Sequence, residues 1–210
     1  MSTSPQGGTA KAALRAELLR RRAERPGRER AAAARSVAST LATRLAGVPT
    51  VAAFVPDPTE AGHGRLPGAL AGTGARVLLP VVPAHGRELD WAVHTGQLAR
   101  GRFGLLEPVG PRLGPAALAA AGAVVVPAAA VARDGARLGR GGGYYDRALR
   151  HAPAGAVLVA VVFDDELVDR LPTEPHDVRV TAVVTPSGGW QALPAGHCHS
   201  GRTQPPDSVE

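Results

Sequence analysis

The chain has 210 residues, a formal net charge of +6 and a single cysteine, Cys198. It fits one compact α/β domain, and it has neither a run of about 18 apolar residues nor the apolar core of a signal peptide, so we expect a cytoplasmic protein with no membrane partner. One cysteine excludes an internal disulfide, and the scarcity of aromatic residues, 3% of the chain, argues against a stacking platform for single-stranded nucleic acid.

The N-terminal part is predicted to hold two helices. We expect residues 1–9 to be disordered, because they are polar and contain glycine. Apolar residues then recur at helical spacing over 11–25 and, beyond Pro26-Gly27, over 28–46. The arginines of this region are expected to form a solvated face; they are Arg20, Arg21, Arg22, Arg25, Arg28 and Arg30.

Short apolar runs bounded by proline or glycine predict the strands. These runs lie at 50–55, 75–79, 88–94, 123–126, 156–163 and 179–184. Helical segments are expected between them at 66–71, 115–121, 144–151 and 164–171. The Gly/Pro-rich stretch 95–115 is expected to be a loop.

The alternation of strands with helical segments predicts βαβ units, and hence an α/β fold with a mainly parallel sheet covered by helices on both faces. Residues 10–186 are expected to form a single catalytic domain. Residues 187–210 lack periodicity and are expected to be a disordered tail. Ligands of such sheets bind beyond the carboxyl ends of the strands, so the segment that follows strand 123–126 is a candidate site.

Residues 137–146, Arg-Leu-Gly-Arg-Gly-Gly-Gly-Tyr-Tyr-Asp, carry the strongest functional signal in the chain. Glycines let backbone N–H groups approach a ligand and adopt positive φ, and consecutive amides can form a concavity that binds anions. Neighbouring arginines suit polyphosphate oxygens, and Asp146 could hold the Mg²⁺ that accompanies a nucleotide. We interpret this glycine segment as a phosphate-binding site, most simply for ATP.

The glycine segment differs from two familiar nucleotide-binding loops. It lacks the Gly-Lys-Ser/Thr ending of a Walker A loop, and its glycines are not spaced as Gly-x-Gly-x-x-Gly. A flexible turn before a helix is the structural alternative, which the flanking arginines, tyrosines and aspartate make less attractive.

Three other segments carry polar side chains that could face the same rim. Lys11 and Arg15 are four residues apart and share a helix face, where they could clamp phosphates or form an ordinary surface pair. Glu60 follows a strand end, where it could bind a donor-rich heterocycle or be an ordinary loop acid. His176 or Asp177 could approach the rim or lie in a solvated turn.

Taken in chain order, these segments resemble the 5-formyltetrahydrofolate cyclo-ligase family, also called methenyltetrahydrofolate synthetase. The resemblance runs from about Lys11 to Pro186. The glycine segment is highly specific, and the other motifs are individually weak but concordant. Those motifs are Lys-x-x-Leu-Arg at 11–15, Glu60 after its strand, Leu79-Pro80, Gly-x-Phe-Gly-x-x-Glu-Pro at 101–108, Val126-Pro127, and Leu-Pro-x-Glu-x-His-Asp at 171–177 ahead of Val184-Thr185.

The resemblance implies an ATP- and Mg²⁺-dependent cyclisation of 5-formyltetrahydrofolate to 5,10-methenyltetrahydrofolate, with release of ADP and phosphate. In the family's mechanism the formyl oxygen attacks the γ-phosphate to give an N5-iminium phosphate, and N10 then attacks the activated carbon. The implied fold is a three-layer α/β/α domain akin to sugar-phosphate isomerases and CoA transferases. We expect a monomer that binds 5-formyltetrahydrofolate and ATP, and no nucleic acid.

The resemblance also implies roles for individual residues of this sequence. Arg140 and Tyr144 are expected to be catalytic, because they would face both the folate and the transferring phosphate. Val55 and Glu60 are expected to line the pterin site with these two residues, Glu60 accepting hydrogen bonds from pterin N–H groups. The expected ATP contacts are Lys11, Arg15, Arg137, Gly139, Arg140, Gly141, Gly142, Gly143, Tyr144 and Tyr145, and the expected Mg²⁺ ligands are Asp146 and Asp177.

Two other functions remain open on the sequence alone. Sugar-phosphate isomerases and acyl-CoA transferases share this architecture, and a fold by itself does not separate them from a cyclo-ligase. A nucleic-acid-binding protein would explain the charge of +6 and would bind with a steep dependence on salt. The abundance of Ala, Arg, Gly and Pro beside a single lysine, Lys11, indicates a compositional bias instead.

Overall fold

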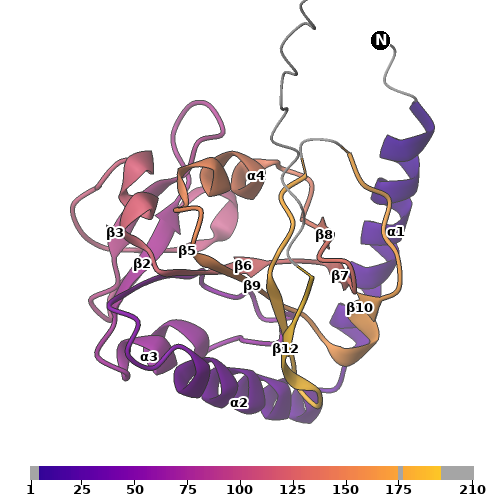
Figure 1. Cartoon of the computed structure of the whole chain (residues 1–210), viewed down its shortest axis with the longest axis horizontal. Coiled ribbons are helices and arrows are strands. Elements are labelled where there is room, and N and C mark those ends of the chain that lie inside the picture. The colour runs from indigo at the N-terminus through magenta and orange to yellow at the C-terminus, as the bar shows by residue number, and fades with distance from the viewer. Residues whose placement is uncertain (1–4, 175–176, 195–210) are drawn as a thin grey trace, which may run out of the picture.

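The computed structural model of the protein describes residues 5–174 and 177–194. Its centre is a seven-stranded sheet with the strand order β12-β11-β9-β6-β1-β2-β3 (Figure 1). The five inner strands run parallel, and the edge strands β3 and β12 run antiparallel to their neighbours. The strands are β1 (Thr50–Ala52), β2 (Arg76–Val81), β3 (Asp90–Val93), β6 (Ala123–Pro127), β9 (Val157–Val161), β11 (Ala182–Thr185) and β12 (Gly189–Ala192).

Helices cover both faces of this sheet, which confirms the predicted mainly parallel α/β fold (Figure 1). One face carries α2 (Gly27–Arg44) and α3 (Leu66–Ala71). The other carries α4 (Tyr144–Ala148) with the 3₁₀ turns η2 (Pro115–Ala120) and η3 (Leu149–His151).

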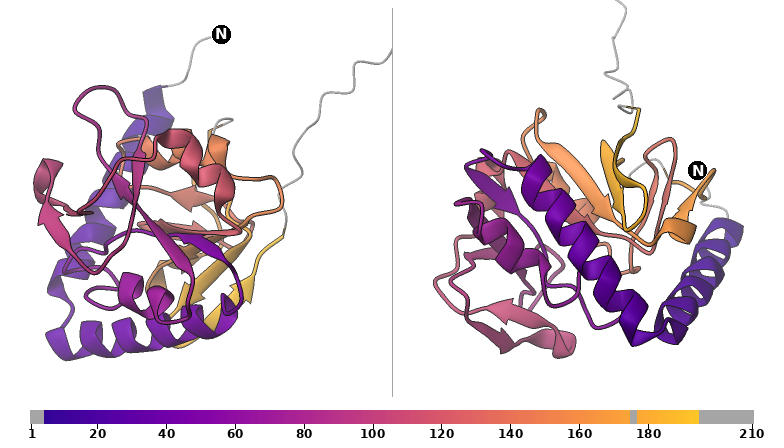
Figure 2. Two further views of the ribbon diagram at one scale, coloured as in Figure 1. Left: turned by 90° about the vertical axis from the view of Figure 1, so that its left-hand side faces the viewer. Right: turned by 90° about the horizontal axis from the view of Figure 1, so that it is seen from below.

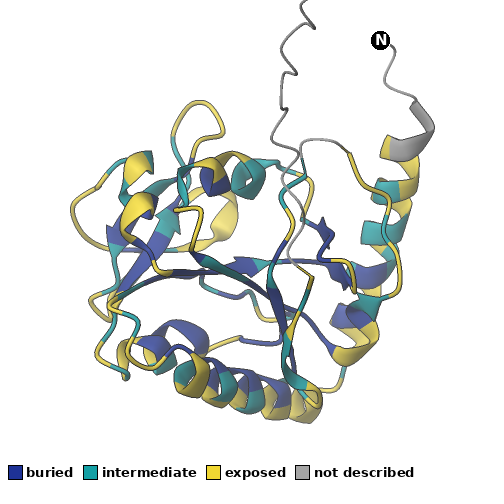
Figure 3. Ribbon diagram, viewed as in Figure 1, coloured by how far each residue is buried: buried dark blue, intermediate teal, exposed yellow. Residues whose placement is uncertain are grey.

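Side-chain alternation along the strands divides the core into two clusters, one on each face of the sheet. Val125 packs with α2 and α3, whereas its neighbours Val124 and Val126 pack with Leu118 of η2 and Leu149 of η3. The inner strands are largely buried on both faces, while α2 buries one stripe and exposes the opposite one (Figure 3).

Helix α1 (Pro5–Glu24) lies beside the sheet and not on either of its faces, and it meets α2 at a sharp angle (Figure 2). It packs through Leu18 on a small sheet with the order β10-β7-β8. That sheet is formed by β7 (Ala130–Ala132), β8 (Arg137–Leu138) and β10 (Leu167–Val168). The small sheet thereby fixes the start of the glycine segment against α1.

The strand order creates a crevice at the centre of the sheet. The chain passes from β1 outward to β2, and then resumes on the other side of β1 with β6, β9 and β11. Loops leaving the carboxyl ends of β1 and β6 therefore diverge to opposite faces, and such a switch point is where open α/β sheets bind ligands.

The sequence predicted most of the long elements, but several short ones were missed. Residues 95–115, expected to be a loop, contain the hairpin of β4 (Leu98–Arg100) and β5 (Leu106–Pro108), joined through η1 (Arg102–Gly104). Strands of two or three residues, including β7 and β8, are too short to show a period in the sequence.

Three further expectations were wrong in part. The segment 164–171 is not a helix, because it contains the single turn η4 (Asp164–Glu166) followed at once by β10. Helix α1 begins at Pro5, inside the stretch expected to be disordered. Strand β12 lies inside the expected tail and pairs with β11, since register with an existing edge strand supplies the order that periodicity did not predict. Residues 1–4, His176 and 195–210 lie outside the described residues.

Candidate active site

A cavity of about 700 Å³ opens at the switch point between β1 and β6. Every residue expected to contact ATP, folate or metal lines this one cavity. They come from α1, the segment after β1, the glycine segment and Asp177. The tertiary structure thus brings together side chains that are up to 166 positions apart in sequence, the separation of Lys11 and Asp177.

The glycine segment takes backbone conformations that other residues adopt only under strain. Gly141 has φ +96° and Gly143, which caps α4, has φ +67°. A Cβ atom at Gly141 would lie 3.3 Å from the Arg15 guanidinium, and one at Gly142 would lie 2.7 Å from the Tyr144 ring. The segment therefore depends on bare backbone, which leaves its amides accessible to a ligand.

The two cations of α1 hold the surrounding loops. Arg15 Nε donates a 2.7 Å hydrogen bond to the Gly139 carbonyl, and Lys11 Nζ donates a 2.8 Å bond to Asp177 Oδ2. Both side chains line the cavity. The spacing of four residues thus places both cations at the same site, as the sequence predicted, and each one also orders a second candidate segment.

Arg137 ties the two ends of the glycine segment together. Its side chain is nearly buried, forms an ion pair with Asp146 and donates a 3.3 Å hydrogen bond to the Pro127 carbonyl. In the described part of the chain its Nε has no hydrogen-bond partner. These contacts anchor the base of the loop on the carboxyl end of β6.

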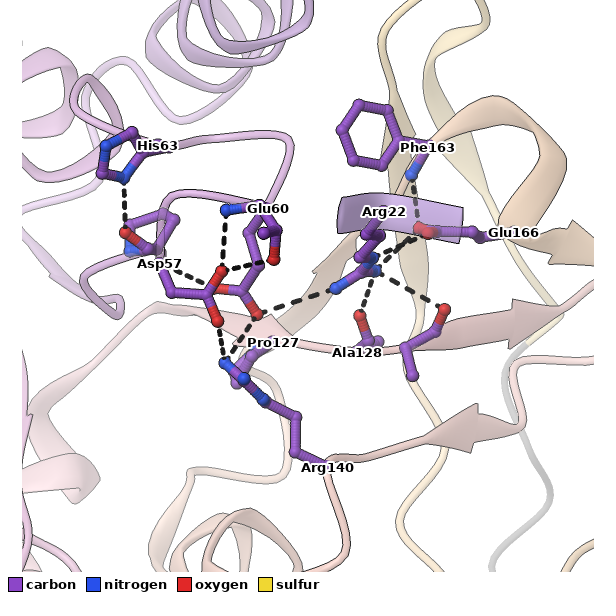
Figure 4. A network of polar contacts seen from close by, with 12 residues as sticks. Arg22, Asp57, Glu60, His63, Pro127, Ala128, Arg140, Phe163 and Glu166 are labelled. Carbon is purple, nitrogen blue, oxygen red and sulfur yellow. Dashed lines mark hydrogen bonds and ion pairs between the residues drawn. The ribbon is translucent and has the colours of Figure 1, made fainter. Parts of the chain in front are cut away.

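A second cluster, the carboxylate pair Asp57 and Glu60, lies in the loop after β1, and its Glu60 lines the cavity. Arg140 of the glycine segment forms an ion pair with Asp57 and lies 3.5 Å from Glu60 Oε1 (Figure 4). Glu60 is 5% exposed, and its Oε2 accepts a 2.8 Å hydrogen bond from the Asp57 backbone N–H. One arginine therefore bridges the glycine segment and the expected pterin site.

The two carboxyl groups have pKa values shifted in opposite directions. Burial and the neighbouring Asp57 charge raise the pKa of Glu60, against the opposing effects of Arg140 and Arg22. Burial also acts to raise the pKa of Asp57, but hydrogen bonds from Thr59 and the Arg140 charge outweigh it and leave that pKa lowered. Asp57 is therefore the firmly ionised member of the pair, and Glu60 the member sensitive to its surroundings.

The tyrosines of the glycine segment differ in their environments. The Tyr145 hydroxyl is buried and, among the described residues, has no hydrogen-bond partner. Burial and the charge of Glu60 raise the pKa of Tyr145, so this hydroxyl stays protonated and can act as a donor. Tyr144 packs its ring over Gly142, and both tyrosines line the cavity.

Val55 and the β4–β5 hairpin supply the apolar wall of the cavity. Phe103 of η1 has φ +56° and is 72% exposed, and it lines the cavity together with Leu105 and Leu106. Glu107 in β5 accepts a 2.9 Å hydrogen bond from the Val82 N–H and thereby joins the hairpin to the sheet. An exposed apolar rim of this kind suits the aromatic body of a ligand.

The acidic residues of the cavity suit a metal ion that is bound mainly by the phosphate oxygens of a nucleotide. The described residues contain no group of three or more His, Cys, Asp or Glu side chains arranged to hold a metal. Asp146 and Asp177 both line the cavity, and each is already paired with one cation. A carboxylate has about four lone-pair sites, and Mg²⁺ uses one or two carboxylates with phosphate oxygens and water, so the two aspartates fit this mode.

Three residues of the site were not anticipated from the sequence. Asp57 lies between two prolines, Pro56 and Pro58, in a loop, and Glu166 lies in an expected helix. Arg22 was expected on a solvated face but is 1% exposed. Only its spacing hinted otherwise, because Lys11, Arg15 and Arg22 recur at intervals of four and seven, which place them on one face of a helix.

The sequence model of the 5-formyltetrahydrofolate cyclo-ligase family matches residues 8–186. The 5-formyltetrahydrofolate cyclo-ligase of Mycolicibacterium smegmatis is 44% identical over 188 residues, which cover 87% of this chain and 97% of that protein. The chain belongs to the 5-formyltetrahydrofolate cyclo-ligase family. It is therefore an enzyme of the cyclo-ligase class, and the match favours this class over an isomerase or a CoA transferase.

Other relatives agree with this family membership. The Escherichia coli 5-formyltetrahydrofolate cyclo-ligase is 34% identical over 146 residues, covering 68% of this chain and 80% of that protein. The 5,10-methenyltetrahydrofolate synthetase structure from Aquifex aeolicus superimposes with a TM-score of 0.73 at 27% identity, covering 92% of this chain and 99% of that one. The corresponding Mycoplasma pneumoniae structure, at 20% identity and a TM-score of 0.65, covers 82% of this chain and 96% of that one and supports the fold.

No helix within the described ranges has the length and apolar character needed to cross a bilayer. The family match ends at residue 186, whereas the main sheet continues through β12 at Gly189–Ala192. The final strand of the sheet thus lies beyond the residues that the family model matches.

Proposed function

We propose that this enzyme converts 5-formyltetrahydrofolate to 5,10-methenyltetrahydrofolate with consumption of Mg·ATP. One observation carries the proposal: the glycine segment and the buried carboxylate Glu60 line the same cavity, and Arg140 joins them. We call the glycine segment with Lys11, Arg15 and Asp177 the phosphate wall, and Glu60 with Val55 and Phe103 the folate wall. A cyclo-ligase must hold a triphosphate and a folate in contact, and such a cavity suits that task.

The chemistry needs little covalent help from the protein. A formyl amide is a poor electrophile, so its oxygen first attacks the γ-phosphorus, the bond to the ADP oxygen breaks, and an N5-iminium phosphate forms. N10 then attacks the formyl carbon, phosphate leaves with the C–O bonding electrons, and N10 loses its proton to give the methenyl product. The protein's contribution is to position the two ligands and stabilise the charge on the phosphoryl group.

The residues of the phosphate wall have complementary parts in this scheme. Amides of the glycine segment donate to the triphosphate, and Lys11 and Arg15 add positive charge from α1. Arg140 is exposed enough to exchange its carboxylate partners for the transferring phosphoryl group. Asp146 and Asp177 hold Mg²⁺, which neutralises charge on the phosphates when bound.

The folate wall recognises the pterin. In its ionised form Glu60 accepts hydrogen bonds from pterin N–H groups, and burial makes these bonds stronger than they would be in water. Val55 lies against the heterocycle, and the Phe103 rim covers the apolar part of the substrate. Tyr144 lines the cavity beside Gly142 and orients the formyl group.

The test is a spectroscopic assay on the purified protein. With 5-formyltetrahydrofolate and Mg·ATP we expect the absorbance of the methenyl product to grow, with one ADP formed per product molecule. Omission of ATP or chelation of Mg²⁺ should abolish the signal. Absence of product together with absence of calorimetric heat on addition of Mg·ATP or 5-formyltetrahydrofolate would contradict the proposal.

A further inference from the structure

Arg22 lies buried between the folate wall and the rest of the fold. Its side chain is 1% exposed and projects from α1 toward the carboxyl ends of β1 and β6 (Figure 4). Buried arginines are rare unless they are paired. Its contacts therefore identify what the fold uses this charge for.

One edge of the Arg22 guanidinium is held rigidly by Glu166. Nε donates a 2.7 Å hydrogen bond to Glu166 Oε1, and Nη2 donates one of 2.7 Å to Glu166 Oε2. Nη2 also donates a 2.6 Å bond to the Ala128 carbonyl. Glu166 in turn accepts a 2.8 Å bond from the Phe163 N–H. This two-bond arrangement fixes the orientation of the guanidinium plane.

The remaining nitrogen of Arg22 faces the folate wall. Nη1 is buried, has no hydrogen-bond partner among the described residues, and lies 3.7 Å from Glu60 Oε1. Leaving a guanidinium N–H buried without a bond is unfavourable. Because Nη1 lies near Glu60 and has no other partner among the described residues, its contribution is to the electrostatics of Glu60.

We infer that Arg22 is a positioning residue for substrate recognition: clamped by Glu166, it keeps Glu60 ionised and oriented as the acceptor for the pterin. This inference rests on the proposed function. Arg22 does not reach the cavity surface, so it acts through Glu60 and makes no contact with the folate.

The charges around Glu60 show why a second cation is needed. Asp57 faces it from the same loop and Tyr145 from α4, whereas Arg140 faces it from the glycine segment and Arg22 from α1. The proposed phosphoryl transfer requires Arg140 to turn toward the phosphate. Arg22 is then the one cation in this set that stays beside Glu60 throughout the reaction.

The decisive experiment compares the pH dependence of KM for 5-formyltetrahydrofolate in the wild type and in the double variant Arg22→Met/Glu166→Gln. Removing both charges together avoids an unpaired buried ion, and glutamine keeps an acceptor for the Phe163 N–H. We expect KM for the folate at pH 7 to rise about tenfold, as for loss of one charge-assisted contact. KM for ATP should stay at the wild-type value.

The pH profile separates positioning from a structural role. Without Arg22 the pKa of Glu60 rises further. As pH is lowered, the double variant should therefore lose folate binding about one pH unit above the pH at which the wild type loses it, and binding should recover in alkaline solution. Glu166→Gln alone frees the Arg22 charge for Glu60, so this variant should lose folate binding at a lower pH than the wild type. Arg22→Lys keeps a positive charge and should retain much of the wild-type pH profile. An increase in KM that is independent of pH, or shifts of equal sign in both variants, would overturn the inference.

Two controls keep the inference distinct from the proposed function. Arg20→Met removes an exposed arginine of the same helix, which pairs with Glu17 and Glu24, and should leave both KM values unchanged. Thermal unfolding of each variant shows that the protein is folded under assay conditions. A wild type without cyclo-ligase activity would refute the proposed function itself, whereas an active wild type with an unaltered double variant would refute only the role of Arg22.

Discussion

The two walls of the cavity are built on opposite physical principles. The centre of the phosphate wall is the glycine segment, residues 137–146, which is contiguous in sequence and in which Gly141 and Gly143 have positive φ. The folate wall depends on buried charges from separate elements, because Glu60 in the loop after β1 is approached by Arg22 of α1, which lies outside the cavity lining. The first is encoded locally, whereas the second exists only when the whole chain has folded.

The two walls also differ in how they are stabilised. Backbone strain in the glycine segment is relieved because glycine has no Cβ atom, so residue type alone solves the problem. Burial of Glu60, Arg22 and Glu166 carries a desolvation cost that only mutual pairing can offset. The phosphate wall should therefore tolerate changes in distant packing, and the folate wall should not.

The largest effect is expected at Arg140, the residue that joins the two walls. Arg140→Ala should lower kcat by about 1,000-fold, because a positioned arginine supplies much of the charge stabilisation in phosphoryl transfer. Steady-state kinetics measures this, with Arg150→Ala, an exposed arginine of η3, as the control. An unchanged kcat in Arg140→Ala would show that the two walls work without the bridge.

Glu60→Gln should act on the folate wall alone. We expect KM for 5-formyltetrahydrofolate to rise about 30-fold, the effect of losing a buried charge-assisted acceptor, with KM for ATP little changed. If KM for ATP rises equally, the two walls are not separate.

The same variant tests the raised pKa of Glu60 through stability. A raised pKa means that the folded state holds the proton more tightly than the unfolded state, so the wild type loses stability as pH rises from the ordinary glutamate pKa through the raised one. Glutamine removes this loss. Thermal unfolding should therefore find Glu60→Gln more stable relative to the wild type at about pH 8 than at about pH 4, and the opposite trend would contradict the shift.

Asp146→Asn should weaken Mg²⁺ binding at the phosphate wall. The Mg²⁺ concentration for half-maximal rate is expected to rise about tenfold, because a neutral amide is a poorer ligand for a hard cation. The variant also leaves Arg137 without its ion-pair partner, so its thermal unfolding must be measured alongside. Asp177→Asn is the matched variant, and an unaltered Mg²⁺ titration in Asp146→Asn would exclude ligation there.

The smallest effect is expected from Gly141→Ala. A Cβ at φ +96°, 3.3 Å from the Arg15 guanidinium, should distort the loop and raise KM for ATP about fivefold. Gly47→Ala is the control, since Gly47 also has positive φ, +81°, but has open space around it and lies outside the cavity lining. It should lose comparable stability without a change in KM, and equal KM effects in both would refute a specific role for the loop.

The sequence predicted the fold well where elements are long and apolar. The inner strands and helices α2 and α3 were found within a few residues, because burial on one or both faces leaves a clear pattern. The β4–β5 hairpin and β12 were missed because they lie in Gly- or Pro-containing stretches without a clear apolar run, and their order comes from pairing with a neighbouring strand. The turn at Glu166 was mistaken for a helix because its end is set by contacts with Arg22 and the Phe163 N–H.

The site was predicted unevenly for the same reason. The glycine segment could be identified from residue type, whereas spacing left Lys11 and Arg15 open between a phosphate clamp and a surface pair, and the family resemblance pointed to the clamp; the structure brings all of them to one cavity. Arg22 was interpreted as a solvated arginine because charge in a basic helix is normally exposed. Nothing in the local sequence indicates that Glu166, 144 positions away, is its partner.

By itself, the sequence predicted the inner strands of the sheet and the glycine segment, because both depend on residue types that are neighbours along the chain. Only the tertiary structure decided where the charges lie. The strand order opens the crevice between β1 and β6, and packing of α1 beside it buries Arg22 between Glu60 and Glu166. The energy of a buried charge depends on every partner around it, and those partners meet only in the folded chain.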